Sequence, residues 1–124
     1  MDLLNDAIAA FNTRRYDEAV TLTAVGLRNA VGRDELFWMG LHEASQAFAD
    51  IADNKLSQSE SKLVASMEKL RHFGYRHQNL EVTSVLAGLR RGLEEVRAVR
   101  SGERRIFDLT LLPQIKMAAK ADSR

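Results

Sequence analysis

The residues best suited to chemistry lie near the middle of this 124-residue chain. His42 and Glu43 are adjacent, and Asp50 follows about two helical turns later. Imidazole and carboxylate groups bind divalent cations and exchange protons, so these residues are the candidate site of a metal-binding or hydrolytic enzyme. Ligand pairs on a helix need a spacing of three or four residues, whereas the residue four after His42 is Gln46, a poor metal ligand, and Glu43 lies beside His42. The pattern therefore favours a solvated polar face over a site.

Other catalytic patterns are missing from the sequence. The chain has no cysteine, which excludes disulfides, thiolate metal sites and thiol nucleophiles. It has no glycine-rich phosphate loop, nucleophile elbow or His-Glu-x-x-His motif. His72 and His77 flank Gly74 at a spacing that fits a capping or surface role better than a ligand pair. We expect no cofactor and no obvious small-molecule substrate, and the sequence leans away from an enzyme.

Basic residues gather towards the end of the chain. Glu94, Glu95 and Glu103 interleave with them, and no aromatic residue lies between Tyr75 and Phe107 to stack on a base. Alternating charge signs on a helix are typical of an exposed face crossed by ion pairs. Nucleic-acid binding through this surface is the weakest functional hypothesis. It would use Arg90, Arg91, Arg97, Arg100, Arg104 and Arg105.

Length and composition indicate one intracellular domain. A chain of this size builds a single core, and 45% hydrophobic with 28% charged residues is ordinary for a globular protein. The net charge of +1 gives no bulk attraction to nucleic acid or anionic lipid. The acidic start of the chain does not resemble a signal peptide, and no apolar run approaches the roughly 18 residues of a membrane span. We expect a cytoplasmic protein of prokaryotic type without a membrane partner.

Hydrophobic periodicity predicts that helices carry these residues, so the fold class is all-α. The expected architecture is a compact bundle of about five helices over residues 1–117, followed by a frayed tail over 118–124. Ser57-Gln58-Ser59-Glu60 reads as a capping box that opens the fourth helix. Residues 76–79 are expected to form a loop, and no alternation is long enough for a sheet. The first and last helices are expected over about 3–12 and 82–100. The second runs from near Tyr16 to Gly32, the central one is opened by Arg33 or Asp34, and the fourth runs from the capping box to a stop at Gly74.

The central helix has one broad apolar face, formed by Phe37, Leu41, Ala44, Phe48, Ile51 and Ala52. Gly40 interrupts the helix, where glycine costs about 1 kcal/mol relative to alanine, so a neighbouring helix is expected to approach closely there. Trp38 lies about 100° from Phe37, at the edge of the apolar face. It is either a second-layer core residue or an exposed anchor of an interface.

The residues from 103 to 117 are too apolar for a free tail. Pro113 restricts the residue before it to an extended conformation. We expect an extended segment that packs across the bundle or onto a partner. Together with Trp38, the predicted interaction residues are Phe107, Leu109, Leu111, Leu112 and Ile115.

Two helical stretches resemble the domain-of-unknown-function 309 family of small helical prokaryotic proteins. The first, residues 11–19, is similar to the family's Phe-Asn-x-x-x-Tyr-x-Glu-Ala signature, and the second, 37–44, to its Phe-x-x-Gly-Leu-x-x-x-Ala helix. Leu112-Pro113-Gln114-Ile115 is similar to the family's proline-bearing tails. The matching residues of the two helical stretches, which the resemblance assigns a structural role, are Phe11, Asn12, Tyr16, Glu18, Ala19, Phe37, Gly40, Leu41 and Ala44.

The chain departs from this family at its polar positions. Val20 and Thr21 stand where the family has His-Glu, so of the polar set in that helix only Glu18 remains. The family has no settled biochemical activity to carry over, so what the resemblance implies is the fold, a compact bundle of about five helices. Residues 10–27 also resemble one tetratricopeptide hairpin, but its period near 34 residues does not recur, so we infer shared hairpin geometry alone. The leading hypothesis is a non-catalytic protein-interaction module, either with a partner protein or as a homodimer.

Overall fold

The computed structural model describes residues 2–103, which fold into five α-helices and one short β-hairpin. The prediction of an all-α bundle is confirmed. The C-terminal segment, with Phe107, Leu109, Leu111, Leu112 and Ile115, and the tail over 118–124 lie outside the described residues. The elements are α1 (Leu3–Asn12), α2 (Tyr16–Asn29), α3 (Arg33–Ala52), α4 (Leu56–Leu70), the 3-10 turn η1 (Arg71–Phe73), β1 (Arg76–His77), β2 (Leu80–Glu81) and α5 (Val82–Arg100).

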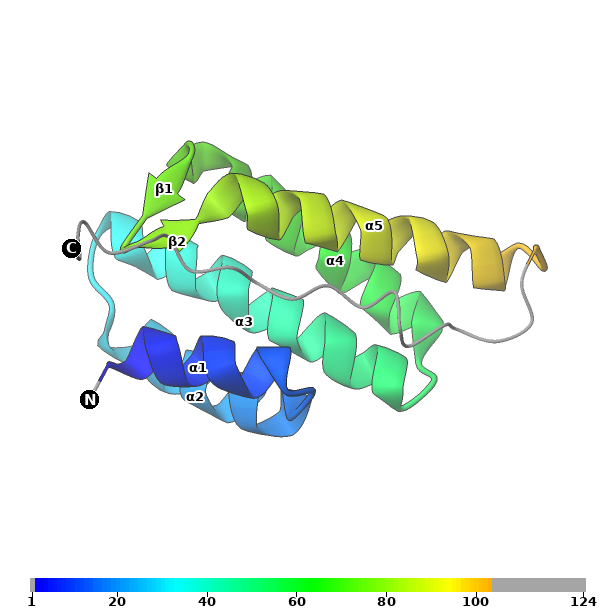
Figure 1. The fold of residues 1–124 in the computed structure, drawn as a ribbon, viewed down its shortest axis with the longest axis horizontal. Helices are drawn as coiled ribbons and strands as arrows, with labels where there is room; N and C mark the ends of the chain where they lie inside the picture. Colours follow the sequence, from blue (N-terminus) through cyan, green and yellow to red (C-terminus); the bar gives the residue numbers. More distant parts are fainter. Residues whose placement is uncertain (1, 104–124) are drawn as a thin grey trace.

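Helix α3 lies at the centre of the bundle (Figure 1). It packs against α2 on one side and α4 on the other, while α1 pairs with α2 and α5 pairs with α4. Successive helices run in opposite directions, so the α2–α3 link and the hairpin meet at the same end of the bundle (Figure 1). Within residues 2–103, no helix combines the length and the apolar composition that a membrane crossing requires.

The core is built on the apolar face that the sequence assigned to the central helix. Phe37, Leu41, Ala44, Phe48 and Ile51 are buried, whereas Ala52, the last residue of α3, is exposed, so its predicted place on the buried face is wrong. The ring of Phe48 meets the ring of Phe11 edge-on, with 5.1 Å between centroids, and stacks on Tyr16 at 5.8 Å. A Cβ atom at Gly92 would lie 3.0 Å from the same ring. Phe48 therefore connects α3 with α1, α2 and α5 at once.

Gly40 lies where α3 and α4 pack closely against each other, and its expected role is confirmed. A Cβ atom built on Gly40 would lie 2.8 Å from two carbons of the Leu70 side chain. The Ser66 hydroxyl donates a 2.7 Å hydrogen bond to the Gly40 carbonyl. This bond satisfies a buried hydroxyl and fixes the two helices in register.

Trp38 is a buried core residue and not an exposed anchor of an interface. Only 7% of its surface is exposed, and it packs on Gly26 of α2, where a Cβ atom would lie 2.3 Å from the indole. The sequence left both alternatives open because Trp38 lies at the edge of the apolar face. Its burial depends on a glycine in another helix, which periodicity within α3 does not reveal.

The capping box predicted at the start of α4 does not form. The N-cap of α4 is Lys55, two residues before Ser57, and no side chain caps the helix. Ser57 lies inside the first turn, and the Glu60 carboxylate accepts hydrogen bonds from Arg97 and Arg100 of α5. Two bonds from cationic guanidinium groups to the ionised carboxylate are stronger than one bond from a neutral backbone N–H, so the tertiary contact prevails.

Part of the predicted loop is a hairpin. β1 and β2 pair antiparallel, with His77 opposite Leu80. The connecting residues Gln78 and Asn79 both have positive φ angles, 50° and 66°, which is the conformation of a two-residue hairpin turn. Strands of two residues are too short for any alternation to appear in the sequence. The buried Leu80 side chain holds the hairpin to the core.

Candidate functional site

His42 faces helix α2. Its Nδ1 atom lies 3.0 Å from the Thr23 hydroxyl, and the ring also bonds to the backbone of Val20. Burial, which disfavours the charged imidazolium, lowers the pKa of His42 below its ordinary value. His42 is therefore a neutral, half-buried side chain that joins α3 to α2.

Glu43 and Asp50 face the opposite neighbour, α4. The Glu43 carboxylate lies 2.9 Å from the Lys69 ammonium group, and the Asp50 carboxylate lies 2.7 Å from that of Lys62. The expectation of a solvated polar face is wrong for these residues, because each is partly buried and bonded to an adjacent helix. In the described part of the chain, no group of three or more His, Cys, Asp or Glu side chains could hold a metal ion. The structure therefore does not bring His42, Glu43 and Asp50 together into one site.

His72 and His77 also make contacts with different residues. His72 is exposed, and its carbonyl accepts a hydrogen bond from the Arg33 guanidinium. The Nε2 atom of His77 lies 2.8 Å from the Asp34 carboxylate, and its ring lies 4.6 Å from Phe37. The hydrogen bond with His77 is the main reason that the pKa of Asp34 lies below its ordinary value. His77 thus attaches the hairpin to the start of α3.

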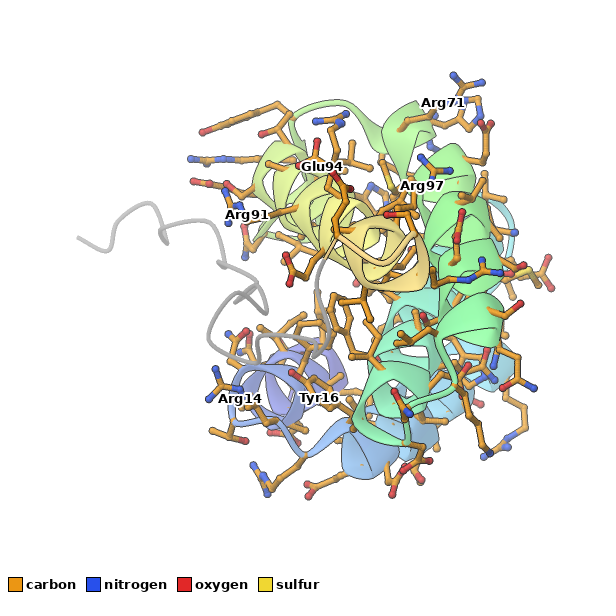
Figure 2. All side chains as sticks on the ribbon, turned by 90° about the vertical axis from the view of Figure 1, so that its right-hand side faces the viewer. Arg14, Tyr16, Arg71, Arg91, Glu94 and Arg97 are labelled. Atoms are coloured by element: carbon orange, nitrogen blue, oxygen red, sulfur yellow. The ribbon has the colours of Figure 1, made fainter. Side chains whose placement is uncertain are left out.

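The outer face of α5 is more basic than the sequence indicated. Glu95 is buried, with 5% of its surface exposed, so its charge is not on that face. Glu94 is the one glutamate of α5 that is exposed. Figure 2 shows Arg91, Glu94 and Arg97 projecting outward from α5. The exposed arginines of α5 are Arg90, Arg91, Arg97 and Arg100, and Arg104 and Arg105 lie outside the described residues.

Two of these arginines share one carboxylate on α4. Arg97 Nε lies 2.9 Å from one oxygen of Glu60, and Arg100 Nη1 lies 2.5 Å from the other. The Glu60 side chain is 22% exposed, whereas those of Arg97 and Arg100 are 57% and 45% exposed. The hydrogen bonds from Arg97 and then from Arg100 hold the pKa of Glu60 below its ordinary value. This pair of guanidinium groups, the arginine clamp, recognises a carboxylate already in the free protein.

A hollow of about 400 Å³ lies beside the arginine clamp, between the start of α4 and the end of α5. The apolar side chain that lines the hollow is Val64, which is 39% exposed. The helical spacing of Leu63, Val64, Met67 and Leu70 predicts one apolar face, on which Val64 would be buried. Periodicity gives no sign that Glu60 and Arg100 meet. A carboxylate on one helix and two arginines on another form no local pattern. The lining residues are Ser57, Glu60, Ser61, Val64 and Arg100.

The residues that carry the family resemblance are mostly core residues. Glu18 is the charged member, and it is exposed and paired with Arg15 at 2.9 Å. Asn12 is half-buried at the end of α1. A structural role therefore fits their positions. The buried members are Phe11, Tyr16, Ala19, Phe37, Gly40, Leu41 and Ala44.

No protein-family model, curated protein sequence or solved structure matches the chain. The fold and the described surface define a small helical bundle that has a basic face on its last described helix. The resemblance to the domain-of-unknown-function 309 family stays a prediction that rests on the quoted residues.

Proposed function

We propose that this protein is a non-catalytic interaction module that binds an acidic segment of a partner protein through the outer face of α5. One observation carries this proposal. Glu95 points away from that face and is buried, which leaves four exposed arginines and a single exposed glutamate on the helix. A face of net positive charge attracts an acidic partner and raises its rate of association.

Two features favour an acidic protein segment over nucleic acid. The arginine clamp already holds a carboxylate in the free protein, and a carboxylate is the group that an acidic protein segment would present. The sequence of α5 contains no aromatic residue on which a base could stack. Val64 adds an apolar contact beside the clamp, as protein interfaces commonly combine apolar anchors with a polar rim.

An enzyme at the polar face of α3 is less well supported. His42, Glu43 and Asp50 all bond to neighbouring helices, and they face two different neighbours. Of the interaction residues predicted from the sequence, Trp38 lies in the core and the others lie outside the described residues. The proposed surface is therefore a different one. Self-association of the chain is the alternative that light scattering tests.

The test measures binding of a fluorescent oligoglutamate peptide at about 0.15 M ionic strength, where surface charges act over about 8 Å. The double variant Arg90→Gln/Arg91→Gln should bind about tenfold more weakly, a loss of about 1.4 kcal/mol. A matched control, Arg28→Gln/Arg71→Gln, removes two exposed arginines that lie on other helices and should change little. Equal losses in the two double variants would contradict the proposal.

Two further measurements separate the alternatives. Duplex DNA that binds while oligoglutamate does not, with an affinity that falls steeply between low and moderate salt, would replace the proposal with nucleic-acid binding. Light scattering reports self-association. A dimer that survives Arg90→Gln/Arg91→Gln would place the self-association surface elsewhere and count against this face.

A further inference from the structure

The arginine clamp uses only part of its hydrogen-bonding capacity. Each guanidinium group has five N–H donors, and in the described part of the chain Arg97 and Arg100 each bond to Glu60 through one nitrogen. Both arginine side chains are about half exposed. The clamp can therefore receive a second carboxylate, or exchange Glu60 for one.

The hollow beside the clamp has the size and chemistry for one such group. Its volume of about 400 Å³ lies at the small end of ligand sites, which suits a side chain or two better than a cofactor. Arg100 supplies a cation on one side, and Val64 supplies an apolar surface. Ser57 and Ser61 add hydroxyl groups that can donate or accept a hydrogen bond.

We propose that this hollow anchors a carboxylate of the acidic partner, with an adjacent aliphatic side chain on Val64, and that Glu60 competes with the partner for the arginine clamp. This inference rests on the proposed function and adds the anchoring site and its internal competitor. Because Glu60 occupies the donors that the partner needs, the free protein holds the clamp in place but partly neutralised. Binding then exchanges one carboxylate for another.

The sharpest variant is Glu60→Gln, which keeps the size of the side chain and removes its charge. Affinity for the oligoglutamate peptide should rise about tenfold, which corresponds to about 1.4 kcal/mol. Glu94→Gln is the matched control, since it removes the same charge from the same basic face but lies outside the hollow. Its effect should be clearly smaller, because it frees no clamp donor.

Two additional variants test the hollow itself. In the Glu60→Gln background, Arg100→Gln should abolish the gain in affinity. A peptide of alternating Glu and Val should bind more tightly than one of alternating Glu and Ser, and Val64→Ser should remove that difference. Unchanged emission of the single tryptophan and an unchanged circular dichroism spectrum confirm that each variant is folded.

The outcomes separate this inference from the proposed function. Equal effects of Glu60→Gln and Glu94→Gln would overturn the competitor role, even if Arg90→Gln/Arg91→Gln still weakens binding and the basic face stands. A Glu-Val preference that survives Val64→Ser would overturn the apolar contact. Absence of peptide binding to both the wild type and Glu60→Gln would overturn both proposals together.

Discussion

The indole ring of Trp38 packs directly over Gly26, so closely that a Cβ atom on Gly26 would lie 2.3 Å from Cε3 of the indole. This contact joins the last turn of α2 to the second turn of α3. It also allows the approach that brings Thr23 of α2 within 3.0 Å of His42 of α3. The glycine thus determines the burial of the tryptophan and the surroundings of the histidine.

Gly26→Ala should lower the free energy of unfolding by about 1–3 kcal/mol, because the added methyl group overpacks a filled contact. The displaced Trp38 should emit at longer wavelength as water reaches the indole. Urea unfolding followed by the emission of this single tryptophan measures both effects. Thr21→Ala, on the exposed side of the same helix, should change stability by no more than about 0.5 kcal/mol. Wild-type stability in Gly26→Ala would contradict the packing described here.

His42 should make the fold less stable in mild acid. Its pKa in the folded protein lies below its ordinary value of 6.5, mainly because of burial, so the unfolded chain binds more protons than the folded one below that pH. Stability should therefore fall as the pH drops below about 6.5 and level off below the folded pKa. Urea unfolding at about pH 7 and about pH 5 should show a smaller decrease for His42→Gln than for the wild type. An equal decrease in both proteins would assign the effect to another group.

Asp34 should cause a second loss of stability, at a lower pH than the loss caused by His42. Its folded pKa is lowered by the hydrogen bond with His77, so its contribution is present above the unfolded pKa and is lost as the pH falls through the folded value. Asp34→Asn should be less stable than the wild type near neutral pH and should lose less stability on acidification below about pH 4. Glu35→Gln, which changes an exposed acid in the same turn, should keep the wild-type acid profile. Identical profiles for Asp34→Asn and the wild type would refute the contribution of the contact.

Metal ions should not affect stability through the polar face of α3. Since His42, Glu43 and Asp50 bond to different helices, addition of zinc or of a chelator should leave the melting temperature of the protein unchanged. Differential scanning calorimetry of the wild type and His42→Ala measures this. Stabilisation by zinc that is present in the wild type and lost in His42→Ala would restore the metal-binding hypothesis.

Much of the fold could be predicted from local patterns. Apolar spacing placed the helices to within a few residues, and Gly40 in the central helix indicated close packing, which Leu70 provides. The hairpin at Gln78 and Asn79 escaped prediction because its strands have two residues each. The start of α4 was placed late because a capping box was read where Glu60 instead bonds to α5.

The candidate surface was harder to predict. Along residues 90–103 the sequence shows interleaved positive and negative charges. A linear count cannot tell that Glu95 points inward while Glu94 points outward, so it underestimates how basic the exposed face is. Exposure of Val64 was missed for a similar reason. Val64 lies at the edge of the apolar stripe of α4, and the position of the neighbouring helix determines whether its side chain is buried or exposed.

The sequence by itself determined the all-α class, the five helices and the apolar face of α3, because each follows from the spacing of residues within one helix. The tertiary structure decided which polar side chains meet. It divided His42 from Glu43 and Asp50, buried Glu95 and brought Glu60 to Arg97 and Arg100. These contacts join residues far apart in the chain, and their geometry depends on how the helices are oriented against one another. Periodicity within a helix carries no information about that orientation.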